Sequence, residues 1–233
     1  MVEELIEILN RIKNQKIREI VREIIQKPVP SIKTKRTKET GIPLHDSPAA
    51  KYQHHSYPKG LIEHITGTAS VALALCDSIE KVYGGRVDRD IVLAGVLLHD
   101  IFKPITYVQR EDRTYGSSAL GERLDHLTLI LGELYKRKAP LELLHVIAAH
   151  HGRSGPTSPR TIEALVVHIA DFADAALNGE VLNAAHFLVR DCTGEDISFS
   201  SSKDAFDIIY AKYNEGCKGV EAALKRIKKS VNV

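Results

Sequence analysis

Hydrophobic residues return every three or four positions along most of the chain, which is the spacing of amphipathic helices. Leucine, isoleucine and valine keep this spacing over residues 2–26, and Pro28 and Pro30 follow directly. We therefore expect one helix over 2–26, ended by the two prolines. Residues 27–60 predict an irregular arm over the surface, because they contain four more helix-breaking residues: Pro43, Pro48, Pro58 and Gly60.

Helical spacing continues after residue 60, in segments separated by polar or glycine-containing loops. The segment 88–101 is almost entirely apolar, so its helix is expected at the centre of the core. Residues 106–121 are polar and predict a loop or a short hairpin. The other predicted helices start near residues 61, 122, 140 and 159, and two more lie between 180 and 229.

These elements predict an all-α fold, a helical bundle of about seven to nine helices. A chain of 233 residues with 43% hydrophobic and 27% charged residues is ordinary for a globular protein. We expect one domain over 1–233, in which an N-terminal helix and arm (1–60) and C-terminal helices (179–233) flank a core (61–178).

The charge balance and the cysteines indicate which partners and which cellular location to expect. A net charge of +2 gives no general attraction to nucleic acid or to an anionic membrane. No uncharged run approaches the roughly 18 residues of a membrane span, and the first residues do not read as a signal peptide. Cys76, Cys192 and Cys217 contain no CxxC pair, so we expect free thiols and a cytoplasmic location. The amphipathic first and last helices leave open a monomer or a homo-oligomer.

The histidines are the unusual feature of the composition. The chain has 11 of them, and most lie between His54 and His168. Several stand beside apolar residues in the short motifs GLIEH, LLHD, LDH, AAHHG and HIAD. A buried carboxylate costs several kcal/mol unless it is paired or bound to a metal, and helical bundles build metal sites from inward-facing side chains. The candidate metal ligands are His64, His99, Asp100, His126, His150, His151 and Asp171.

Two pairs of adjacent candidates need a special local structure. Successive helical residues point about 100° apart, so neighbours reach one centre only where a helix ends. Pro104 is expected to supply such an end after His99 and Asp100, and Gly152 does so after the HH pair. A carboxylate has two oxygens, and the cations of two-metal hydrolases lie roughly 3.5–4 Å apart. Asp100 is therefore expected to bridge two metal ions.

The order H…HD…H…HH…D resembles the HD-domain metal-dependent phosphohydrolases. GLIEH, LAGVLLHDIFKP, AAHHG and HIAD occur in that order, and the likeness covers roughly residues 50–178. It is greatest to the branch that hydrolyses 7,8-dihydroneopterin 2′,3′-cyclic phosphate to a monophosphate. More distantly, the chain is similar to the HD domain of YhaM-type 3′-to-5′ exoribonucleases. Those enzymes carry an oligonucleotide-binding domain before the HD domain, whereas a helix and an arm are expected here.

The resemblance implies two metal positions that share one carboxylate. The first would be held by His64, His99, Asp100 and Asp171, and the second by Asp100, His126, His150 and His151. Gly60 stands where a three-metal branch has a glutamate, so no third metal is expected. The usual HDIGK motif reads HDIFK, with Phe102 in place of glycine, and Lys103 keeps the implied role of a phosphate contact.

Imidazole and carboxylate ligands without a thiolate suit iron(II), manganese(II) or zinc, and the family favours iron or manganese. Such ions would activate a water for attack on phosphorus. Catalytic roles are expected for Asp100 and Lys103. Lys103 and Arg153 would contact phosphoryl oxygens, and Tyr57 is a candidate for stacking on the base. The expected partner is a small-molecule phosphate ester, with no membrane and no nucleic acid.

Some alternatives stay open at this point. His168 could replace one of the histidines, and Asp174 could replace Asp171 or support a ligand. Tyr107, Arg110 and Tyr115 could form a lid. A phosphatase, nucleotidase or exoribonuclease would share the same metal chemistry, and a nucleotide-binding module without catalysis is the alternative from another class.

Overall fold

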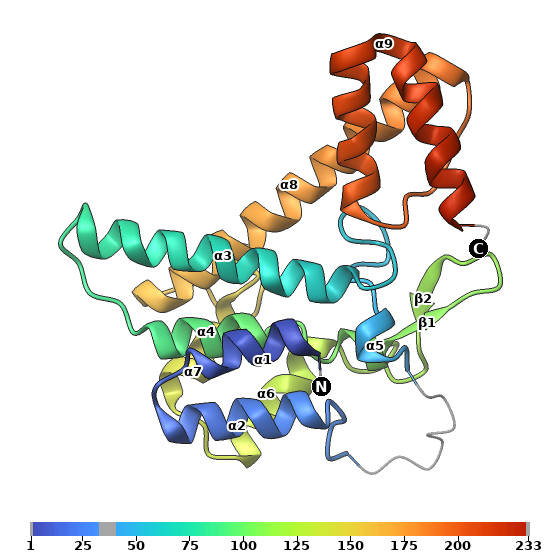
Figure 1. Cartoon of the computed structure of the whole chain (residues 1–233). Helices are drawn as coiled ribbons and strands as arrows, with labels where there is room; N and C mark the ends of the chain where they lie inside the picture. The colour runs from blue at the N-terminus through green and yellow to red at the C-terminus, as the bar shows by residue number, and fades with distance from the viewer. Residues whose placement is uncertain (1, 33–40, 232–233) are drawn as a thin grey trace.

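The computed structural model describes residues 2–32 and 41–231, and helices dominate it, so the all-α prediction is confirmed. Figure 1 shows a helical bundle from which the C-terminal helices project to one side. The short 3₁₀ turns η1 and η2 span Leu44–Asp46 and Gly152–Ser154. The helices are α1 (Glu3–Asn10), α2 (Gln15–Gln26), α3 (Gly60–Lys81), α4 (Arg89–Leu98), α5 (Lys103–Thr106), α6 (His126–Lys136), α7 (Leu141–Ala149), α8 (Ile162–Thr193) and α9 (Ser202–Val231).

The single helix expected over 2–26 is wrong, because the chain turns between α1 and α2. The Asn14 side chain caps α2 by accepting hydrogen bonds from the backbone N–H groups of Lys16 and Ile17. The Asp90 carboxylate accepts from the backbone N–H groups of Lys13 and Asn14 at 2.9 and 2.7 Å. The turn lets both helices bury their apolar sides in the same core.

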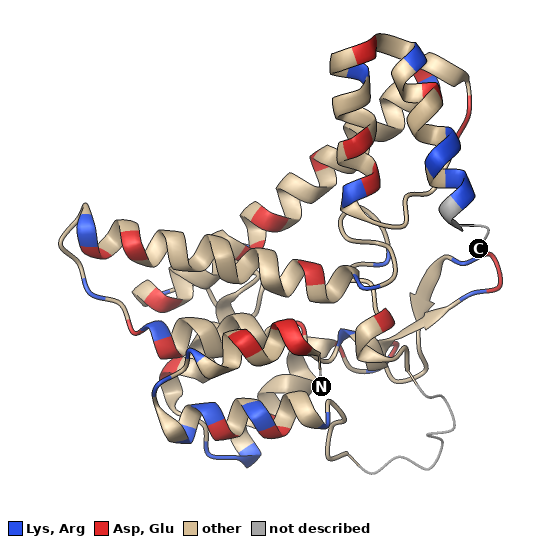
Figure 2. Ribbon diagram, in the orientation of Figure 1, with Lys and Arg blue, Asp and Glu red and all other residues tan. Residues whose placement is uncertain are grey.

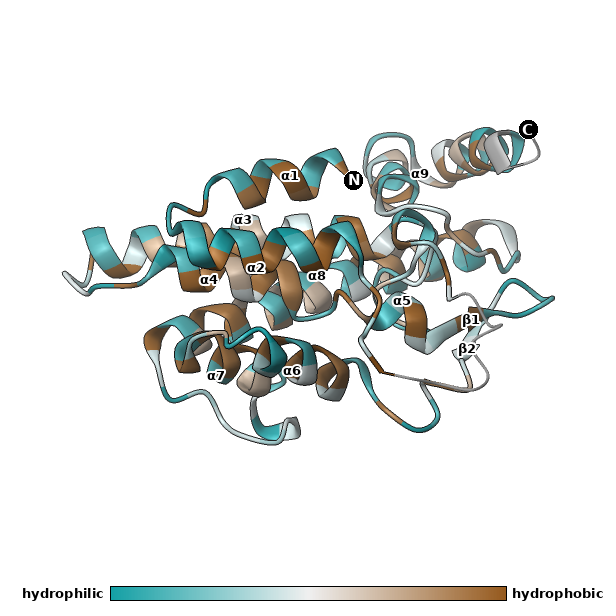
Figure 3. Ribbon diagram, turned by 90° about the horizontal axis from the view of Figure 1, so that it is seen from below, coloured by the Kyte–Doolittle hydropathy of each residue, from teal (hydrophilic) through white to brown (hydrophobic). Residues whose placement is uncertain are grey.

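Helix α4 is the centre of the bundle. Residues 91–98 are all buried, and the helix contacts α1, α2, α3, α7 and α8. Gly95 permits the close approach of α7, since a Cβ atom there would lie 2.4 Å from Val146 Cγ1. Seen from below, apolar residues cover much of α4 and α7 (Figure 3). The residues that follow α4 therefore lie in the middle of the protein.

Helix α8 runs to Thr193, well past the end expected near residue 177. Gly194 ends it in the left-handed conformation, with φ of 71°. The second half of α8 lies beside α9 (Figure 1). Helix α9 bends at Gly216, and the two helices share a second apolar cluster. The two helices predicted after residue 180 are thus the continuation of α8 and α9.

Two cysteines correct the expectation of free thiols. Cys192 near the end of α8 and Cys217 in α9 form a disulfide, with their Cα atoms 5.1 Å apart. The pairing depends on the length of α8 and on the bend in α9, and neither was expected. Cys76 is free and buried.

The arm and the hairpin lie together beside the bundle. The backbone N–H of Ile42 donates to the Pro104 carbonyl at 3.0 Å, and Lys51 Nζ donates to Ser117 Oγ at 2.6 Å. Strands β1 (Tyr107–Gln109) and β2 (Tyr115–Ser117) pair antiparallel, as the polar segment allowed. Residues 33–40 of the predicted arm lie outside the described residues.

Charged residues are spread over the outward faces of the helices, and lysine and arginine gather at the C-terminal end of α9 (Figure 2). Within the described ranges, no helix is both long enough and apolar enough to span a membrane. The single-domain organisation and the cytoplasmic location stay predictions.

A buried glutamate fixes the start of the arm to the bundle. Glu133 in α6 is 5% exposed. Its carboxylate accepts hydrogen bonds from the backbone N–H and the hydroxyl of Ser31 and pairs with Arg137. Burial alone would raise the pKa of Glu133, but the Ser31 N–H and Arg137 together hold it below its usual value.

We predict that Glu133→Gln lowers the free energy of unfolding by about 1–3 kcal/mol at pH 7, because glutamine keeps only one acceptor oxygen and loses the charge that pairs with Arg137. The lowered pKa means that the wild type loses this contribution as the pH falls from about 4.3 through the pKa of the folded state. The difference between the two proteins in urea unfolding should therefore shrink on acidification. A difference that does not change with pH would contradict this explanation.

Candidate metal centre

The end of α4 places two adjacent donors in one centre. The His99 N–H still donates to Gly95 in the helical pattern, but Ile101 and Lys103 donate to residues only three positions earlier. The helix therefore tightens and ends at this point. His99 and Asp100 are 0% and 1% exposed, and both side chains face the same group of residues, as the motif predicted.

The first donor group joins α3, α4 and α8. His64 Nε2 lies 3.1 Å from Asp171 Oδ1 and 3.2 Å from His99 Nε2. One ligand atom from each of these three residues falls within 4.8 Å of the others. Asp100 Oδ2 faces this group, at 3.5 Å from His64 Nε2 and 3.4 Å from His99 Nε2.

The second donor group joins the end of α4, α6 and the turn after α7. It consists of Asp100, His126, His150 and His151, whose ligand atoms also lie within 4.8 Å of one another. Asp100 Oδ1 is 3.2 Å from His126 Nε2. The two oxygens of Asp100 thus face different groups, which is the arrangement expected of a bridging carboxylate.

Unsatisfied polar atoms show that these groups fit a metal. Among the described residues, Asp100 Oδ1, His126 Nε2 and His150 Nε2 are buried without a hydrogen bond of acceptable geometry. Buried polar atoms almost always have partners, and an orphan often marks an ion. The Nδ1 atoms of His99 and His150 bond the carbonyls of Val96 and Ile147 at 2.8 and 2.7 Å. Each Nε2 is thereby left without a proton and free to bind metal.

Lys103 pairs with the carboxylate of Asp100 in the centre. Lys103 Nζ lies 2.5 Å from Asp100 Oδ2, and Lys103 is 8% exposed. Burial alone would raise the pKa of Asp100, but Lys103 and His99 hold it well below its usual range. Burial alone would lower the pKa of Lys103, but the Asp100 carboxylate raises it. The carboxylate and the ammonium group are therefore both charged at neutral pH.

The histidines differ in their protonation. Burial and the neighbouring His99 lower the pKa of His150 to about 3, so its imidazole is neutral. Burial would also lower the pKa of His64, but the surrounding carboxylates of Asp100 and Asp171 raise it well above its usual value. Metal would have to displace a proton from His64, whereas His150 is already in the form that binds metal.

Other predicted residues lie around the centre. Arg153 is exposed, two positions after His151. His168 belongs to neither donor group, and its Nδ1 bonds the His150 carbonyl at 2.7 Å. Its ring fills the space beside Gly152, whose φ is 59° and whose Cβ would lie 2.4 Å from the imidazole. His168 thus supports the turn that carries the HH pair.

Tyr57 is buried, whereas stacking on the base of a substrate would need an accessible ring. It is 3% exposed, and its hydroxyl bonds Ser202 Oγ at 2.9 Å and Asn178 Nδ2 at 3.0 Å. The ring packs in the cluster formed by α8 and α9. The structure therefore gives Tyr57 a role in joining the arm to the C-terminal helices.

Three residues beside His64 received no firm assignment from the sequence. His54 and His55 form with His64 a third set of ligand atoms within 4.8 Å. Asp174 Oδ2 lies 2.7 Å from His64 Nδ1, on the side away from Asp171, and 3.7 Å from His55 Nε2. The HH pair ten residues before His64 and the spacing of Asp171 and Asp174 were the available signals.

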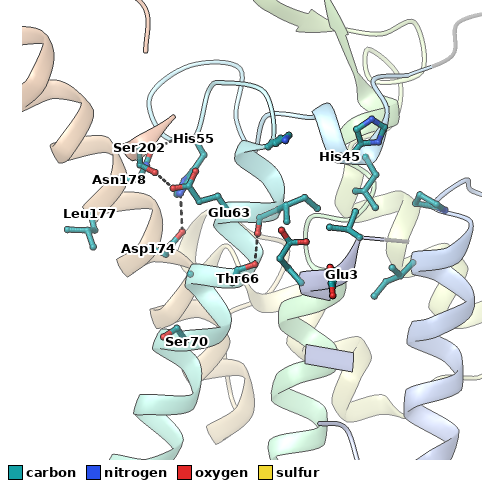
Figure 4. Close-up of a pocket in the computed structure, with 18 of the residues that line it drawn as sticks. Glu3, His45, His55, Glu63, Thr66, Ser70, Asp174, Leu177, Asn178 and Ser202 are labelled. Carbon is teal, nitrogen blue, oxygen red and sulfur yellow. Dashed lines mark hydrogen bonds and ion pairs between the residues drawn. The ribbon is translucent and has the colours of Figure 1, made fainter. Parts of the chain in front are cut away.

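A cavity of about 1120 Å³ lies between α3, the middle of α8 and the start of α1 (Figure 4). His55, Asp174 and Asn178 form part of its wall, and Glu3, Glu4 and Glu63 also line it. The carboxylates make it a poor place for a phosphate ester, since like charges repel. The two donor groups, rather than this cavity, are the candidate reaction site.

The fold and the donor groups define a known class. The family model described as HD domain matches residues 61–176, and its members bind divalent metals. The chain belongs to the HD-domain family of phosphohydrolases, as its motifs predicted, and the prediction of an enzyme is confirmed.

Individual relatives agree with this class. The chain is 37% identical to the dihydroneopterin 2′,3′-cyclic phosphate phosphodiesterase of Methanocaldococcus jannaschii over 235 aligned positions, which cover 100% of this chain and 92% of that protein. It is 29% identical to the 3′-5′ exoribonuclease YhaM of Listeria innocua over 189 positions, covering 76% of this chain. The match spans only 54% of YhaM. No solved structure matches.

We predict that Asp100→Asn removes both metal ions, because the amide cannot supply two anionic oxygens to two positions. Metal content after dialysis, measured by elemental analysis, checks this. Asp77→Asn is the matched control, since Asp77 is 45% exposed and pairs with Arg89 outside the centre. Retention of two ions by Asp100→Asn would show that the carboxylate is not a bridge.

Proposed function

We propose that the chain hydrolyses 7,8-dihydroneopterin 2′,3′-cyclic phosphate to a monophosphate with the help of two divalent transition-metal ions. The observation that carries the proposal is the pair of buried donor groups joined by Asp100. The relative from Methanocaldococcus jannaschii supports the substrate, because the similarity extends over the whole chain.

The proposed metal positions follow the two donor groups. His64, His99, Asp100 and Asp171 would hold one ion, and Asp100, His126, His150 and His151 the other. Imidazole and carboxylate donors suit iron(II) or manganese(II), with zinc as the third candidate. Bound ions would supply a water of lowered pKa and positive charge near the phosphoryl oxygens.

Lys103 is the protein group best placed to act on the phosphate. Its Nζ already touches the Asp100 carboxylate and is nearly buried. With that carboxylate engaged in metal binding, the ammonium group can donate to a phosphoryl oxygen, where charge spreads during phosphoryl transfer. Arg153 is exposed beside the HH turn and can offer a second, bidentate contact. A strained cyclic ester needs little help with its leaving oxygen.

A substrate comparison tests the proposal. The protein loaded with Mn²⁺ or Fe²⁺ should hydrolyse 7,8-dihydroneopterin 2′,3′-cyclic phosphate faster than 3′,5′-cyclic nucleotides, phosphate monoesters or short RNA. Faster degradation of RNA would favour the exoribonuclease that YhaM represents. Metal binding without turnover of any of these would favour a binding module instead.

We predict that Lys103→Met lowers kcat/KM by roughly 100-fold while both ions stay bound, because one charged donor to the transition state is lost. Steady-state kinetics and metal content should be measured on the same sample. Lys81→Met is the control, since the Lys81 side chain is 72% exposed and pairs with Asp77 on the surface. Unchanged kinetics would remove Lys103 from the phosphate contacts.

A further inference from the structure

We propose that Asp174 is a positioning residue which makes the two metal positions unequal, so that the position at His64, His99 and Asp171 binds its ion more tightly. This inference rests on the metal centre of the proposed function. It concerns a carboxylate that belongs to neither donor group.

The contact between Asp174 and His64 fixes the imidazole. His64 is 0% exposed, and its Nδ1 lies 2.7 Å from Asp174 Oδ2. Its Nε2 points the other way, 3.1 Å from Asp171 Oδ1. The Asp174 carboxylate holds the proton on Nδ1, so the proton that a metal ion displaces is the one on Nε2, and Nε2 becomes the ligand atom. A carboxylate behind a metal-binding histidine also makes the ring a stronger donor.

Two other candidate ligands, His99 and His150, have neutral acceptors for Nδ1. His99 and His150 bond peptide carbonyls three residues earlier in the chain, Val96 and Ile147. Those carbonyls orient the rings but carry no charge. Of these three imidazoles, His64 alone bonds a carboxylate through Nδ1. The stronger donor therefore stands in the first group, with His99 and Asp171.

Helix α3 leaves space for the Asp174 carboxylate where it packs on α8. Gly67 lies one turn after His64, and a Cβ atom there would be 2.0 Å from Asp174 Oδ1. Asp174 in turn lies one turn after Asp171 on α8. The same face of α8 thus supplies a candidate ligand and the support of its neighbour. Glycine at position 67 gives the carboxylate its space.

Binding of Mn²⁺ to the metal-free protein tests the inference without reference to turnover. The wild type should bind two ions with different affinities in calorimetric titration. Asp174→Asn keeps the shape but removes the charge, and should weaken the tighter binding step by 10–100-fold, the usual loss when such support is removed. The weaker step should change much less.

A second variant disrupts the contact between Asp174 and His64 without removing the charge. Gly67→Ala keeps the charge of Asp174 but forces its carboxylate away from His64, so it should weaken the same step. Gly132→Ala in α6 is the matched control, because a Cβ atom there meets nothing within 4 Å. Thermal unfolding of the metal-free variants is the companion measurement. If Asp174→Asn does not fold, Gly67→Ala decides the question.

The outcomes separate this inference from the proposed function. A wild type that binds two ions with equal affinity, or variants whose tighter step is unchanged, would overturn the role of Asp174. A loss of stability in the metal-free variants with unchanged metal affinity would show a packing role and would also overturn it. A wild type that binds no ion would instead contradict the metal centre itself.

Discussion

A carboxylate in the middle of an apolar bundle is the constraint on which the structure depends. Asp100 is 1% exposed and stays ionised, a state that costs several kcal/mol without charged partners. Lys103 at 2.5 Å and the imidazoles of His64, His99 and His126 surround it. The helices α3, α4 and α6 must therefore end or cross where these side chains can meet. The bundle is arranged around the charge as much as around its apolar core.

The parts of the fold that depend on local chemistry could be predicted from the sequence. The apolar run before His99 indicated a central helix. Pro104 indicated that this helix ends soon afterwards, so that the adjacent side chains of His99 and Asp100 can face one group of donors. The hairpin and the start of α3 could also be predicted from local sequence signals. The meeting of the candidate donors could be predicted because each stands at a helix end or on an apolar helix, where an unpaired polar group would be costly.

The errors concern contacts between distant residues. The break between α1 and α2 depends on Asp90, which bonds the turn at residues 13 and 14 from across the bundle. The length of α8 and the bend at Gly216 bring Cys192 and Cys217 together. Periodicity in one segment carries no information about such partners. The same limit applies to Tyr57, whose burial comes from Asn178 and Ser202.

Helix α8 connects the candidate metal centre with the C-terminal helices through three polar residues on one face. Asp171, Asp174 and Asn178 follow one another at helical spacing. Asp171 approaches Nε2 of His64, and Asp174 bonds its Nδ1. Asn178 accepts a hydrogen bond from the His55 N–H at 2.6 Å, and these two residues lie near Asp174 in Figure 4. Asn178 also bonds Tyr57, which reaches Ser202 at the start of α9. Because each residue holds the next, the arm and α9 fix the rotation of α8, and with it the placement of Asp171 and Asp174 against His64.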